Sequence, residues 1–461
     1  MTLGQFEDHG DIGEVSKYGT ATFEDGRYRV SGAGTNMWFD RDAFHFVWTR
    51  VTGDVSLAAD VTFEGDGADP HRKAVLVVRA GLGAGAVYAD AALHGDGLTS
   101  LQFRTAAGGV TREVRSVRSA ERRLEIRRRG RTISTVVDGR PAGGAVRLDL
   151  PDEYWVGLGV CSHRDDVMET AVFSDVVLTA VDSTPTRLFS TIETIDISST
   201  DRTVAAVVDR WVEAPNWTRT DDLIVNGEGH LYRVPVTGGE LVEIDTGSAI
   251  ACNNDHGLSP DGSRIAISDQ STEDGLSVIY TLPSTGGEPV RITDQSPSYW
   301  HGWSPDGTML AYCAQRNESF GIFTVPAEGG IEQRLTTAVH LDDGPDYSPD
   351  GEWIYFNSDR TGRMQIHRVR PDGSDLERVL ISGTADWFPH LSPDGRWMVH
   401  LSYAPDVVGH PRDHDVTLVL TDRSNGSSRT IADVFGGQGT LNVPSWSPDS
   451  TRFAFVSYAY L

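Results

Sequence analysis

The sequence predicts an all-β protein: an N-terminal antiparallel β-sandwich of the jelly-roll type, residues 1–182, followed by a six-bladed β-propeller, residues 183–461. Three observations predict this fold class. Short runs of alternating apolar and polar residues dominate the first part, no long helical period occurs, and one turn sequence recurs through the second part. The 49 glycines fit the many turns that such a chain needs.

The first part is predicted to be a sandwich because its short alternating runs are separated by turn-forming residues. The predicted strands are residues 44–51, 54–64, 72–81, 100–105, 123–129, 131–139, 154–162 and 170–180. Many short strands without helices between them are typical of two packed antiparallel sheets. Residues 182–187, with the sequence DSTPTR, are the expected linker to the second part.

The second part is a true repeat, marked by the turn Ser-Pro-Asp-Gly or a close variant. The first turn residue recurs at intervals of 41 to 55 residues, at Thr218, Ser259, Ser304, Ser348, Ser392 and Ser447. A period in the low forties with about four short strands per unit predicts a β-propeller. The last unit stops after two strands. We therefore expect residues 186–198 and 202–210 to supply its outer strands and to close a ring of six blades.

The charge balance limits the partners that the surface can bind. The chain has 66 acidic and 40 basic residues, a net charge of −26, which repels nucleic acid and anionic lipid. Its three cysteines suggest neither a disulfide framework nor a metal-ligand spacing. No export signal and no run of about 20 apolar residues is found, so we expect a cytoplasmic protein that binds neither nucleic acid nor membrane.

Histidines replace proline in two neighbouring repeats. Three residues before the turn most copies have proline, whereas two have His256 and His301. The starts of the first strands are expected to surround the mouth of the central channel, where propellers often place a site. Neutral imidazole is a common ligand for Zn, Mn, Fe or Ni. We predict that a divalent metal is held there by His256, His301, His340, His390, His400 and Gln315.

Other residues expected at the same mouth complete the candidate site, because carboxylates, imidazole and phenol can move protons and aromatic rings can bind sugars. The chain also offers Glu213 and Asn442 at blade starts. The candidate catalytic residues are Tyr403, Arg316, Arg360, Asp255 and Asp343. The candidate substrate contacts are Trp300, Trp387, Asn254, Gln270 and His410.

Each of these residues also has a structural interpretation. A histidine three residues before the turn shares a side of the strand with a tryptophan, so His301 can instead be wedged between blades and bonded to a loop carbonyl. Trp300 and Trp387 suit blade packing as well as sugar binding. Arg360 suits a brace between strand ends.

The second part resembles the TolB-type propeller repeat over about residues 186–461, through the motifs WSPDG, IYFNSDRTG and IHRVRPDGSDLERVL. Residues 409–420 and 435–450 look like bacterial proteins labelled TolB-like or "biopolymer transporter". The resemblance implies the fold and leaves function open, because such blades serve both binding proteins and enzymes. TolB itself is periplasmic and works with the Tol–Pal envelope system.

Two further resemblances concern carbohydrates. Oligogalacturonate lyase is a cytoplasmic propeller of similar blades, with a divalent metal held by His and Gln at the channel mouth. His256, His301, His390, His400 and Gln315 are the same residue types, although the ligand motif does not align and that enzyme has seven blades. Residues 44–65 and 72–81 resemble concanavalin-A-like sandwich modules, which bind sugar or brace a neighbouring domain; we expect the bracing role.

We therefore expect an intracellular carbohydrate-active enzyme, a lyase or hydrolase of oligosaccharides, with a divalent-metal site at the propeller mouth. The metal would polarise the sugar while a His, Tyr403 or Arg316 moves the proton. The alternative is a non-catalytic TolB-like scaffold that binds protein or glycan. A third possibility is an enzyme without metal, in which Asp255 and Asp343 form an acid–base pair.

Overall fold

The computed structural model describes residues 3–119, 123–181, 187–337 and 339–460, and the fold is all-β with a single 3-10 helix, η1 (Gln438–Thr440), among them. The chain forms two compact units. The first comprises Met1–Arg187, Asp201–Val207 and Ala459–Leu461, and the second Leu188–Thr200 and Val208–Tyr458. The predicted linker lies, apart from Arg187, outside the described residues, so the predicted boundary between residues 182 and 183 stays a prediction.

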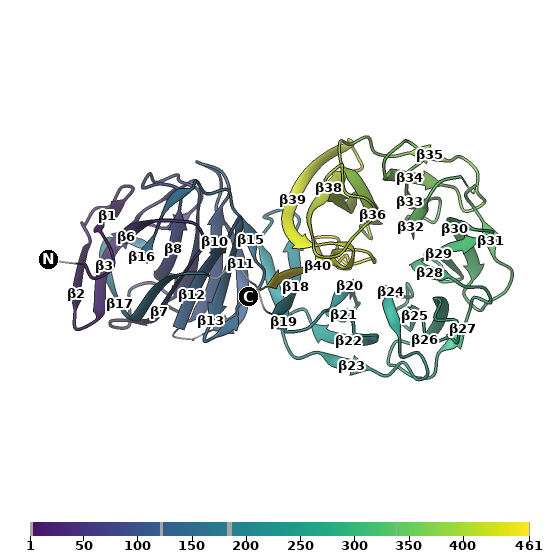
Figure 1. Ribbon diagram of the computed structural model, residues 1–461, viewed down its shortest axis with the longest axis horizontal. Helices are drawn as coiled ribbons and strands as arrows, with labels where there is room; N and C mark the ends of the chain where they lie inside the picture. Colours follow the sequence, from purple (N-terminus) through teal and green to yellow (C-terminus); the bar gives the residue numbers. More distant parts are fainter. Residues whose placement is uncertain (1–2, 120–122, 182–186, 338, 461) are drawn as a thin grey trace. The chain divides into compact units, whose positions relative to one another are not determined.

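The first unit contains two large sheets, antiparallel except for the pairing of β11 with β19, and a small two-stranded one (Figure 1). Its strands are β1 (Asp8–Ile12), β2 (Thr20–Glu24), β3 (Arg27–Gly34), β4 (Met37–Trp38), β5 (Arg41–Asp42), β6 (Phe44–Thr52), β7 (Val55–Phe63), β8 (Lys73–Arg79), β9 (Tyr88–His94), β10 (Leu98–Arg104), β11 (Arg112–Ser119), β12 (Arg123–Arg129), β13 (Thr132–Val137), β14 (Arg140–Pro141), β15 (Val146–Arg147), β16 (Glu153–Cys161), β17 (Arg164–Ala180) and β19 (Arg202–Val208). Within this unit, the strands of one sheet follow the order β1-β6-β16-β8-β9-β10-β11-β19, and those of the other follow the order β14-β13-β12-β7-β17-β3-β2.

One hydrophobic core lies between these two sheets. Leu76 and Leu158 from the first sheet pack with Leu57 and Ile126 from the second, and all four side chains are buried. Alternation in strands such as β17 directs every second side chain to this core. The predicted sandwich strands are thus present, whereas the jelly-roll topology and the likeness to concanavalin A stay predictions.

The second unit contains five four-stranded blades, each with its first strand innermost (Figure 1). The blades are β20 (Glu213–Trp217), β21 (Asp222–Gly227), β22 (His230–Pro235) and β23 (Val242–Ile244); β24 (Cys252–Leu258), β25 (Arg264–Asp269), β26 (Val278–Pro283) and β27 (Val290–Arg291); β28 (Ser298–Trp303), β29 (Met309–Arg316), β30 (Ser319–Pro326) and β31 (Gln333–Arg334); β32 (Asp342–Tyr347), β33 (Ile354–Ser358), β34 (Gln365–Val369) and β35 (Glu377–Arg378); and β36 (Ala385–Leu391), β37 (Trp397–Tyr403), β38 (His414–Asp422) and β39 (Ser427–Gly436).

The prediction of six blades is wrong, because the structure has five. Of the strands expected to complete a sixth blade, β18 (Leu188–Asp196) does lie beside the C-terminal strand β40 (Arg452–Tyr460). The next strand, β19, belongs to the first unit, where it pairs in parallel with β11. Val204 of β19 is 1% exposed in the core of that unit and Val207 packs against the same core. Burial of these apolar side chains therefore stabilises β19 beside β11.

The recurring turn holds the first two strands of each blade through a local hydrogen-bond network. The Ser259 hydroxyl donates to Asp261 Oδ1 at 2.6 Å and accepts from the Arg264 amide at 3.0 Å, while Asp261 Oδ1 also accepts from the Ser263 amide. Gly262 has φ 75°, which glycine adopts without strain. The same bonds recur in the turns that begin at Ser304, Ser348, Ser392 and Ser447.

No helix in the described part of the chain is both long and apolar enough to cross a bilayer.

Candidate functional site

The innermost strands of the five blades are irregular where their side chains approach the channel. The register shifts within the pairing of each first strand with its neighbour. Four residues before the turn, Ala214, Gly344 and Phe388 have φ values of 59°, 61° and 53°. For alanine and phenylalanine this left-handed conformation costs about 1–2 kcal/mol, so surrounding contacts must hold it. Such irregularities redirect side chains and are frequent beside functional sites.

Six polar residues come together inside the channel, and we call them the channel cluster. Each comes from a different part of the ring: one from each of four innermost strands, one from the insertion after β37 and one from the segment after η1. The members are Glu213, Asp255, His301, Asp343, His410 and Asn442. Three of them, His301 and the two aspartates, were predicted to lie in one site, and His410 was predicted beside them.

His301 lies at the centre of the cluster, between two carboxylates. Its Nε2 atom is 3.3 Å from Asp343 Oδ1 and 4.0 Å from Asp255 Oδ1. The ring also stacks on Phe388, with centroids 6.0 Å apart. Burial alone would lower the pKa of His301, but the two carboxylates outweigh it and raise that pKa above its ordinary value. The two carboxylates therefore favour the protonated form of the buried ring.

The carboxyl groups of the cluster have unequal acidities. Burial raises the pKa of Asp255 to about 6, with His301 opposing the rise. Asp343 is also buried, yet the hydrogen bond and charge of His301 lower its pKa to about 2. Burial, together with the charge of the nearby Asp255, raises the pKa of Glu213 to about 7. Asp343 thus stays ionised, whereas the other two exchange protons near neutral pH.

Asn442 and Asn254 connect the carboxyl groups. The fully buried Asn442 donates through Nδ2 to Asp255 Oδ1 at 3.1 Å and to the Asn254 carbonyl at 3.2 Å. The Asn254 side chain, a predicted substrate contact, hydrogen-bonds to Glu213. Gly439 approaches Glu213 so closely that a Cβ there would overlap its carboxylate. These contacts fix the positions of Glu213 and Asp255.

The blade insertion brings His410 to the cluster. His410 Nε2 lies 3.6 Å from Asp343 Oδ2, and its ring makes edge contacts with Trp387 and Phe388. The hydroxyl of Tyr403, a predicted catalytic group, donates to the Pro411 carbonyl at 3.0 Å and so anchors the insertion instead. His410 has 29% of its side chain exposed and Asp343 has 14%, so solvent reaches the cluster past these two residues.

The other predicted metal ligands lie apart from this cluster. His256 Nε2 faces the Ile224 carbonyl at 3.4 Å, and burial lowers its pKa to about 4. His390 Nδ1 pairs with Asp346 at 3.1 Å, and the half-exposed His340 pairs with Asp359. His256 therefore follows the structural interpretation, a buried histidine bonded to a carbonyl of the neighbouring blade.

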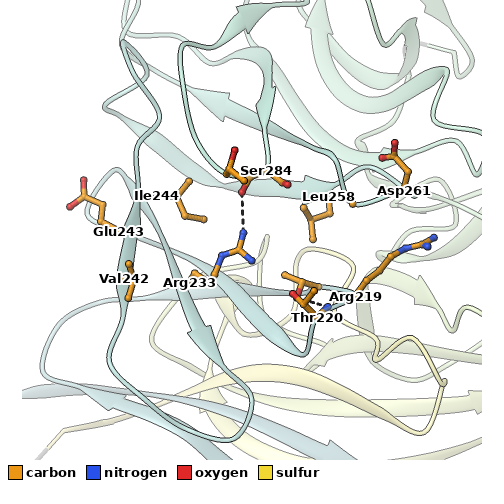
Figure 2. Close-up of a pocket in the computed structure, with 12 residues that line it drawn as sticks. Arg219, Thr220, Arg233, Val242, Glu243, Ile244, Leu258, Asp261 and Ser284 are labelled. Carbon is orange, nitrogen blue, oxygen red and sulfur yellow. Dashed lines mark hydrogen bonds between the residues drawn. The ribbon is translucent and has the colours of Figure 1, made fainter.

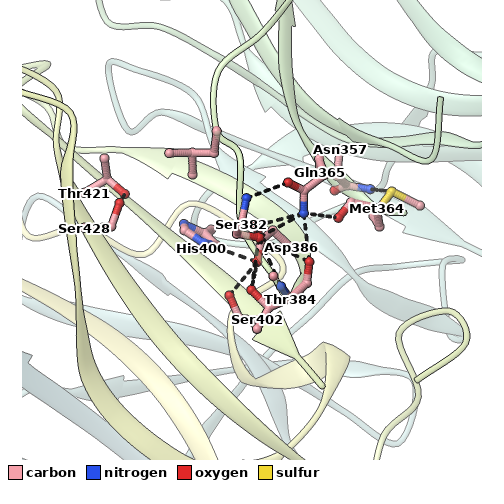
Figure 3. Close-up of polar contacts among 12 residues, drawn as sticks. Asn357, Met364, Gln365, Ser382, Thr384, Asp386, His400, Ser402, Thr421 and Ser428 are labelled. Carbon is pink, nitrogen blue, oxygen red and sulfur yellow. Dashed lines mark hydrogen bonds and ion pairs between the residues drawn. The ribbon is translucent and has the colours of Figure 1, made fainter. Parts of the chain in front are cut away.

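His400 belongs to a separate polar network in the last four-stranded blade (Figure 3). Its Nε2 atom lies 3.7 Å from Asp386 Oδ1. The same carboxylate accepts hydrogen bonds from Ser402 and Thr384 at 2.7 and 2.8 Å, and from Gln365 at 3.3 Å. Burial raises the pKa of Asp386, but the hydrogen bond from His400 and those from serine hydroxyls reverse the effect and lower it. The network holds β36 against β37 and neighbouring segments.

The predicted set of metal ligands does not fit one metal ion. No group of three or more His, Cys, Asp and Glu side chains in residues 3–119, 123–181, 187–337 and 339–460 is arranged to hold one. Gln315, the predicted amide ligand, is on β29 and not among the members of the channel cluster. His256, His390 and His400 each face a different partner, so these contacts do not bring their imidazoles together. Metal binding by the protein stays a prediction.

The remaining predicted site residues have structural partners or lie at the surface. Arg316 binds both carboxylate oxygens of Glu332 at 2.8 Å, and Arg360 binds both oxygens of Asp342 at 2.8 Å. Arg360 is thus the brace between strand ends that was its second interpretation. Gln270 is exposed just after β25. The side chains Trp300 and Trp387 are buried to 1% and 2% exposure, so neither offers a free ring face to a sugar.

Two pockets open at the turn end of the propeller rather than at the channel cluster. The larger, of about 660 Å³, is lined by Trp217, Leu258, Leu391, Trp446 and turn prolines. The smaller, of about 490 Å³, lies between the first two blades and is shown in Figure 2, where Arg233 donates to the Ser284 carbonyl at 3.0 Å. Neither pocket was predicted from the sequence.

Phe388 was missed as a site residue, and Glu213 and Asn442 were noted only at blade starts without a role. A signal for Glu213 and Asn442 exists in the repeat, because both stand five residues before the turn, as Asp343 does. No sequence signal marks Phe388, since its left-handed φ is a property of the folded strand.

Comparisons with known proteins agree on the propeller. The family model described as the TolB beta propeller domain, PD40, matches residues 300–433. An uncharacterized protein of Agrobacterium fabrum is 52% identical over 271 residues, which is 58% of this chain and 92% of that protein. The solved structure of a protein provisionally named TolB, from Agrobacterium tumefaciens, is 50% identical, with a TM-score of 0.58, over 60% of this chain and 100% of that one.

A more distant match is the crystal structure of oligogalacturonate lyase from Vibrio parahaemolyticus, which is 15% identical with a TM-score of 0.37, over 58% of this chain and 78% of that one. The two Agrobacterium proteins are about half identical to this chain over almost their whole length, and the family model matches as well. These matches, and not the distant lyase, identify the family. The chain belongs to the TolB-like PD40 β-propeller family.

Proposed function

We propose that the channel cluster is an acid–base catalytic site that works without a metal, in a lyase or hydrolase of hydroxyl-rich substrates such as oligosaccharides. One observation carries the proposal: His301 Nε2 lies 3.3 Å from Asp343 and 4.0 Å from Asp255, inside the channel. An imidazole held by a carboxylate is a recurring arrangement for proton transfer in enzymes.

The unequal pKa values suggest different roles for the two aspartates. Asp343, whose pKa His301 lowers to about 2 against the effect of burial, would hold the imidazolium in position. Asp255, whose pKa burial raises to about 6, would accept a proton from the substrate near neutral pH. Environments that push two carboxyl pKa values apart are a mark of acid–base sites.

His301 would donate the proton through its second nitrogen. Because Nε2 faces the carboxylates, Nδ1 of the protonated ring carries the other hydrogen; no described residue accepts from it within bonding distance, although the backbone of Asn442 lies close enough to the ring to raise its pKa. A buried donor without an acceptor costs roughly 1–3 kcal/mol. A leaving oxygen of the substrate would supply that acceptor.

The insertion that carries His410 would control access. Residues 404–409 are mostly exposed, and Val408 at their tip is 93% exposed. A segment with so few buried contacts opens at low cost. His410 would leave Asp343, 3.6 Å away, and the rings of Trp387 and Phe388 as the segment moves outward.

The test is turnover of an oligosaccharide panel by the full chain before and after EDTA treatment, with elemental analysis of the purified protein. We expect activity that survives EDTA, a loss of at least 100-fold in His301→Asn, and near-normal turnover in His256→Asn, which changes the same position of the neighbouring repeat. General acid–base groups contribute about 10²–10⁴-fold, so the loss should be large.

Asp255→Asn is the second variant, because it removes the proposed base without removing the imidazole. It should also lower turnover strongly while the protein stays folded by circular dichroism. Full activity in His301→Asn would overturn the proposal. Activity that EDTA abolishes and Mn or Zn restores would favour the metal-dependent enzyme expected from the sequence.

The competing function is a non-catalytic TolB-like scaffold that binds protein or glycan. The observation that favours it is the pocket of about 660 Å³ at the turn end, whose wall includes Trp217 and Trp446. Aromatic and proline-rich hollows suit binding without chemistry. Retention of a ligand on the intact protein, with no turnover of any panel member, would support this function.

For the first unit we propose a concanavalin-A-like module that braces a neighbouring domain rather than binding sugar. This proposal is supported by residues 44–65 and 72–81, the two segments that resemble such modules. They form the largely buried strands β6, β7 and β8. Glycan-array binding by the full chain that persists after His301→Asn and after mutation of the turn-end pocket would contradict the bracing role.

A further inference from the structure

The channel cluster has more negative than positive charge. Asp255, Asp343 and Glu213 supply three carboxyl groups, and His301 is the one fully buried basic side chain that faces them among the described residues. The other cationic candidates are peripheral: His410 contacts Asp343 from the exposed side, and Arg412, which lies near Glu213, has 69% of its side chain exposed and stacks on Trp211. Once His301 balances Asp343, at least one carboxyl group has no buried positive partner.

The hydrogen-bonding groups of the cluster are mostly acceptors. Asn442 is fully buried, and its Nδ2 is already used by Asp255 Oδ1 and the Asn254 carbonyl. Its Oδ1 atom is buried without a partner among the described residues. The amide orientation follows from these bonds, because a flipped amide would place its oxygen against a carboxylate and a carbonyl. A buried acceptor beside carboxylates calls for a donor that the protein does not supply.

Aromatic rings stand beside these acceptors. Phe388 stacks near His301, Trp387 and Phe388 both contact His410, and Tyr299 is close enough to Asp255 for that carboxylate, after burial, to raise its pKa. Aromatic faces attract cations and repel anions. The aromatic rings around the cluster therefore favour a positively charged ligand, as its carboxylates do.

We propose that the channel cluster selects a ligand that carries a protonated amine, so that the substrate of the proposed acid–base reaction is an amine-bearing saccharide. The ammonium group would donate to Asp255, Glu213 and Asn442 Oδ1, while an oxygen of the same ligand accepts from His301 Nδ1. This inference rests on the proposed function, which it narrows from hydroxyl-rich substrates to amino sugars. It also excludes polyanionic sugars, because their carboxylates would face those of the cluster.

The ligand test uses three disaccharides of similar size: the deacetylated chitosan disaccharide, which is cationic, cellobiose, which is neutral, and digalacturonate, which is anionic. Titration calorimetry at pH 7 on the full chain should show the chitosan disaccharide binding at least tenfold more tightly than cellobiose, with no binding of digalacturonate. Repeating the titration in buffers of different ionisation enthalpy should show proton release, because an ammonium group stabilises the ionised forms of Asp255 and Glu213.

Variants separate the cluster from general surface charge. Asp255→Asn should reduce the preference for the amine at least fivefold. Asp359→Asn should leave that preference unchanged, because its carboxylate is 47% exposed and pairs with His340 away from the cluster. A calcium titration completes the set: competition by Ca²⁺ with the disaccharide would identify the occupant as a metal cation and overturn the proposal.

Other outcomes decide between this inference and the proposed function. Equal affinity for cellobiose and the amine, tighter binding of digalacturonate, or no binding of any sugar would overturn the inference. Turnover of a neutral sugar that His301→Asn abolishes would leave the proposed function intact at the same time. Selective binding of the amine without any turnover would have the opposite meaning: the inference would stand and the catalytic function would fall.

Discussion

His256 and His301 occupy the same position in neighbouring repeats, three residues before the turn, yet their surroundings differ in every respect that matters for chemistry. His256 faces a carbonyl of the adjacent blade, and burial lowers its pKa to about 4. His301 faces two carboxylates, which raise its pKa in spite of burial. The same side chain on the same scaffold is therefore a neutral packing group in one blade, whereas in the next blade two carboxylates favour its protonated form.

The difference arises from the neighbouring strand, not from the repeat itself. The strand that faces His301 presents Asp343, whereas His256 meets the backbone of Ile224. A buried carboxylate and a buried carbonyl differ by a full charge, and at low dielectric that charge decides which protonation state is stable. A histidine in place of proline three residues before the turn therefore does not indicate one particular role in these repeats.

The largest expected effect is on stability, in His301→Leu. Removing the imidazole leaves Asp343 and Asp255 buried without their cation, which costs about 3–5 kcal/mol. The folded-state pKa of His301 is raised, so its contribution is fully present below pH 6.5 and is lost as the pH rises through the folded value. Urea unfolding at pH 6 and pH 9 should show the larger loss at pH 6. An equal, small loss at both would mean that His301 only packs.

The two aspartates should respond with opposite signs. The pKa of Asp255 is raised to about 6, so its ionisation weakens the folded state as pH rises from 3.8 to 6, and Asp255→Asn should stabilise the protein at pH 7 by up to about 3 kcal/mol. The pKa of Asp343 is lowered to about 2, so its contribution is present above pH 3.8 and is lost as pH falls through 2. Asp343→Asn should therefore destabilise the protein at pH 7 by about 2 kcal/mol.

Unfolding of both asparagine variants at pH 7 and pH 4.5 measures these effects. The gain in Asp255→Asn should shrink at pH 4.5, where the wild-type carboxyl is largely protonated in the fold. Destabilisation of similar size in both variants would show that the carboxylates act through shape and hydrogen bonds rather than through charge.

The smallest effect is expected in the matched variant of the preceding blade, His256→Leu. It removes one long hydrogen bond to the Ile224 carbonyl, and a change of this kind costs about 1–2 kcal/mol. Because burial lowers the folded-state pKa of His256 to about 4, protonation of this histidine in the unfolded chain weakens the wild-type fold below about pH 6.5, so the cost of the substitution should be slightly smaller at pH 6 than at pH 9. A loss that matches His301→Leu in size and pH dependence would remove the contrast between the two positions.

Much of the candidate site could be anticipated from blade positions alone. Counting back from the turn placed Asp255, His301 and Asp343 at one end of the innermost strands, where the structure has them in one cluster. The same counting also gathered His256, His390 and His400, which point to separate partners. Position along a strand predicts height in the channel, but bulges and left-handed residues such as Phe388 decide where each side chain is aimed.

The sequence by itself determined the blades, because their turns depend on bonds within six residues, such as those joining Ser259, Asp261 and Arg264, and their strands on local alternation. Only the tertiary structure decided the blade number and the charge of the site. The sequence predicts that strand β19 is a blade strand, yet its Val204 is buried in the core of the first unit, to which the strand belongs. The protonated form of His301 is favoured because Asp343, 42 positions away in the chain, lies 3.3 Å from its ring, and a contact between residues so far apart in the sequence depends on how the blades close.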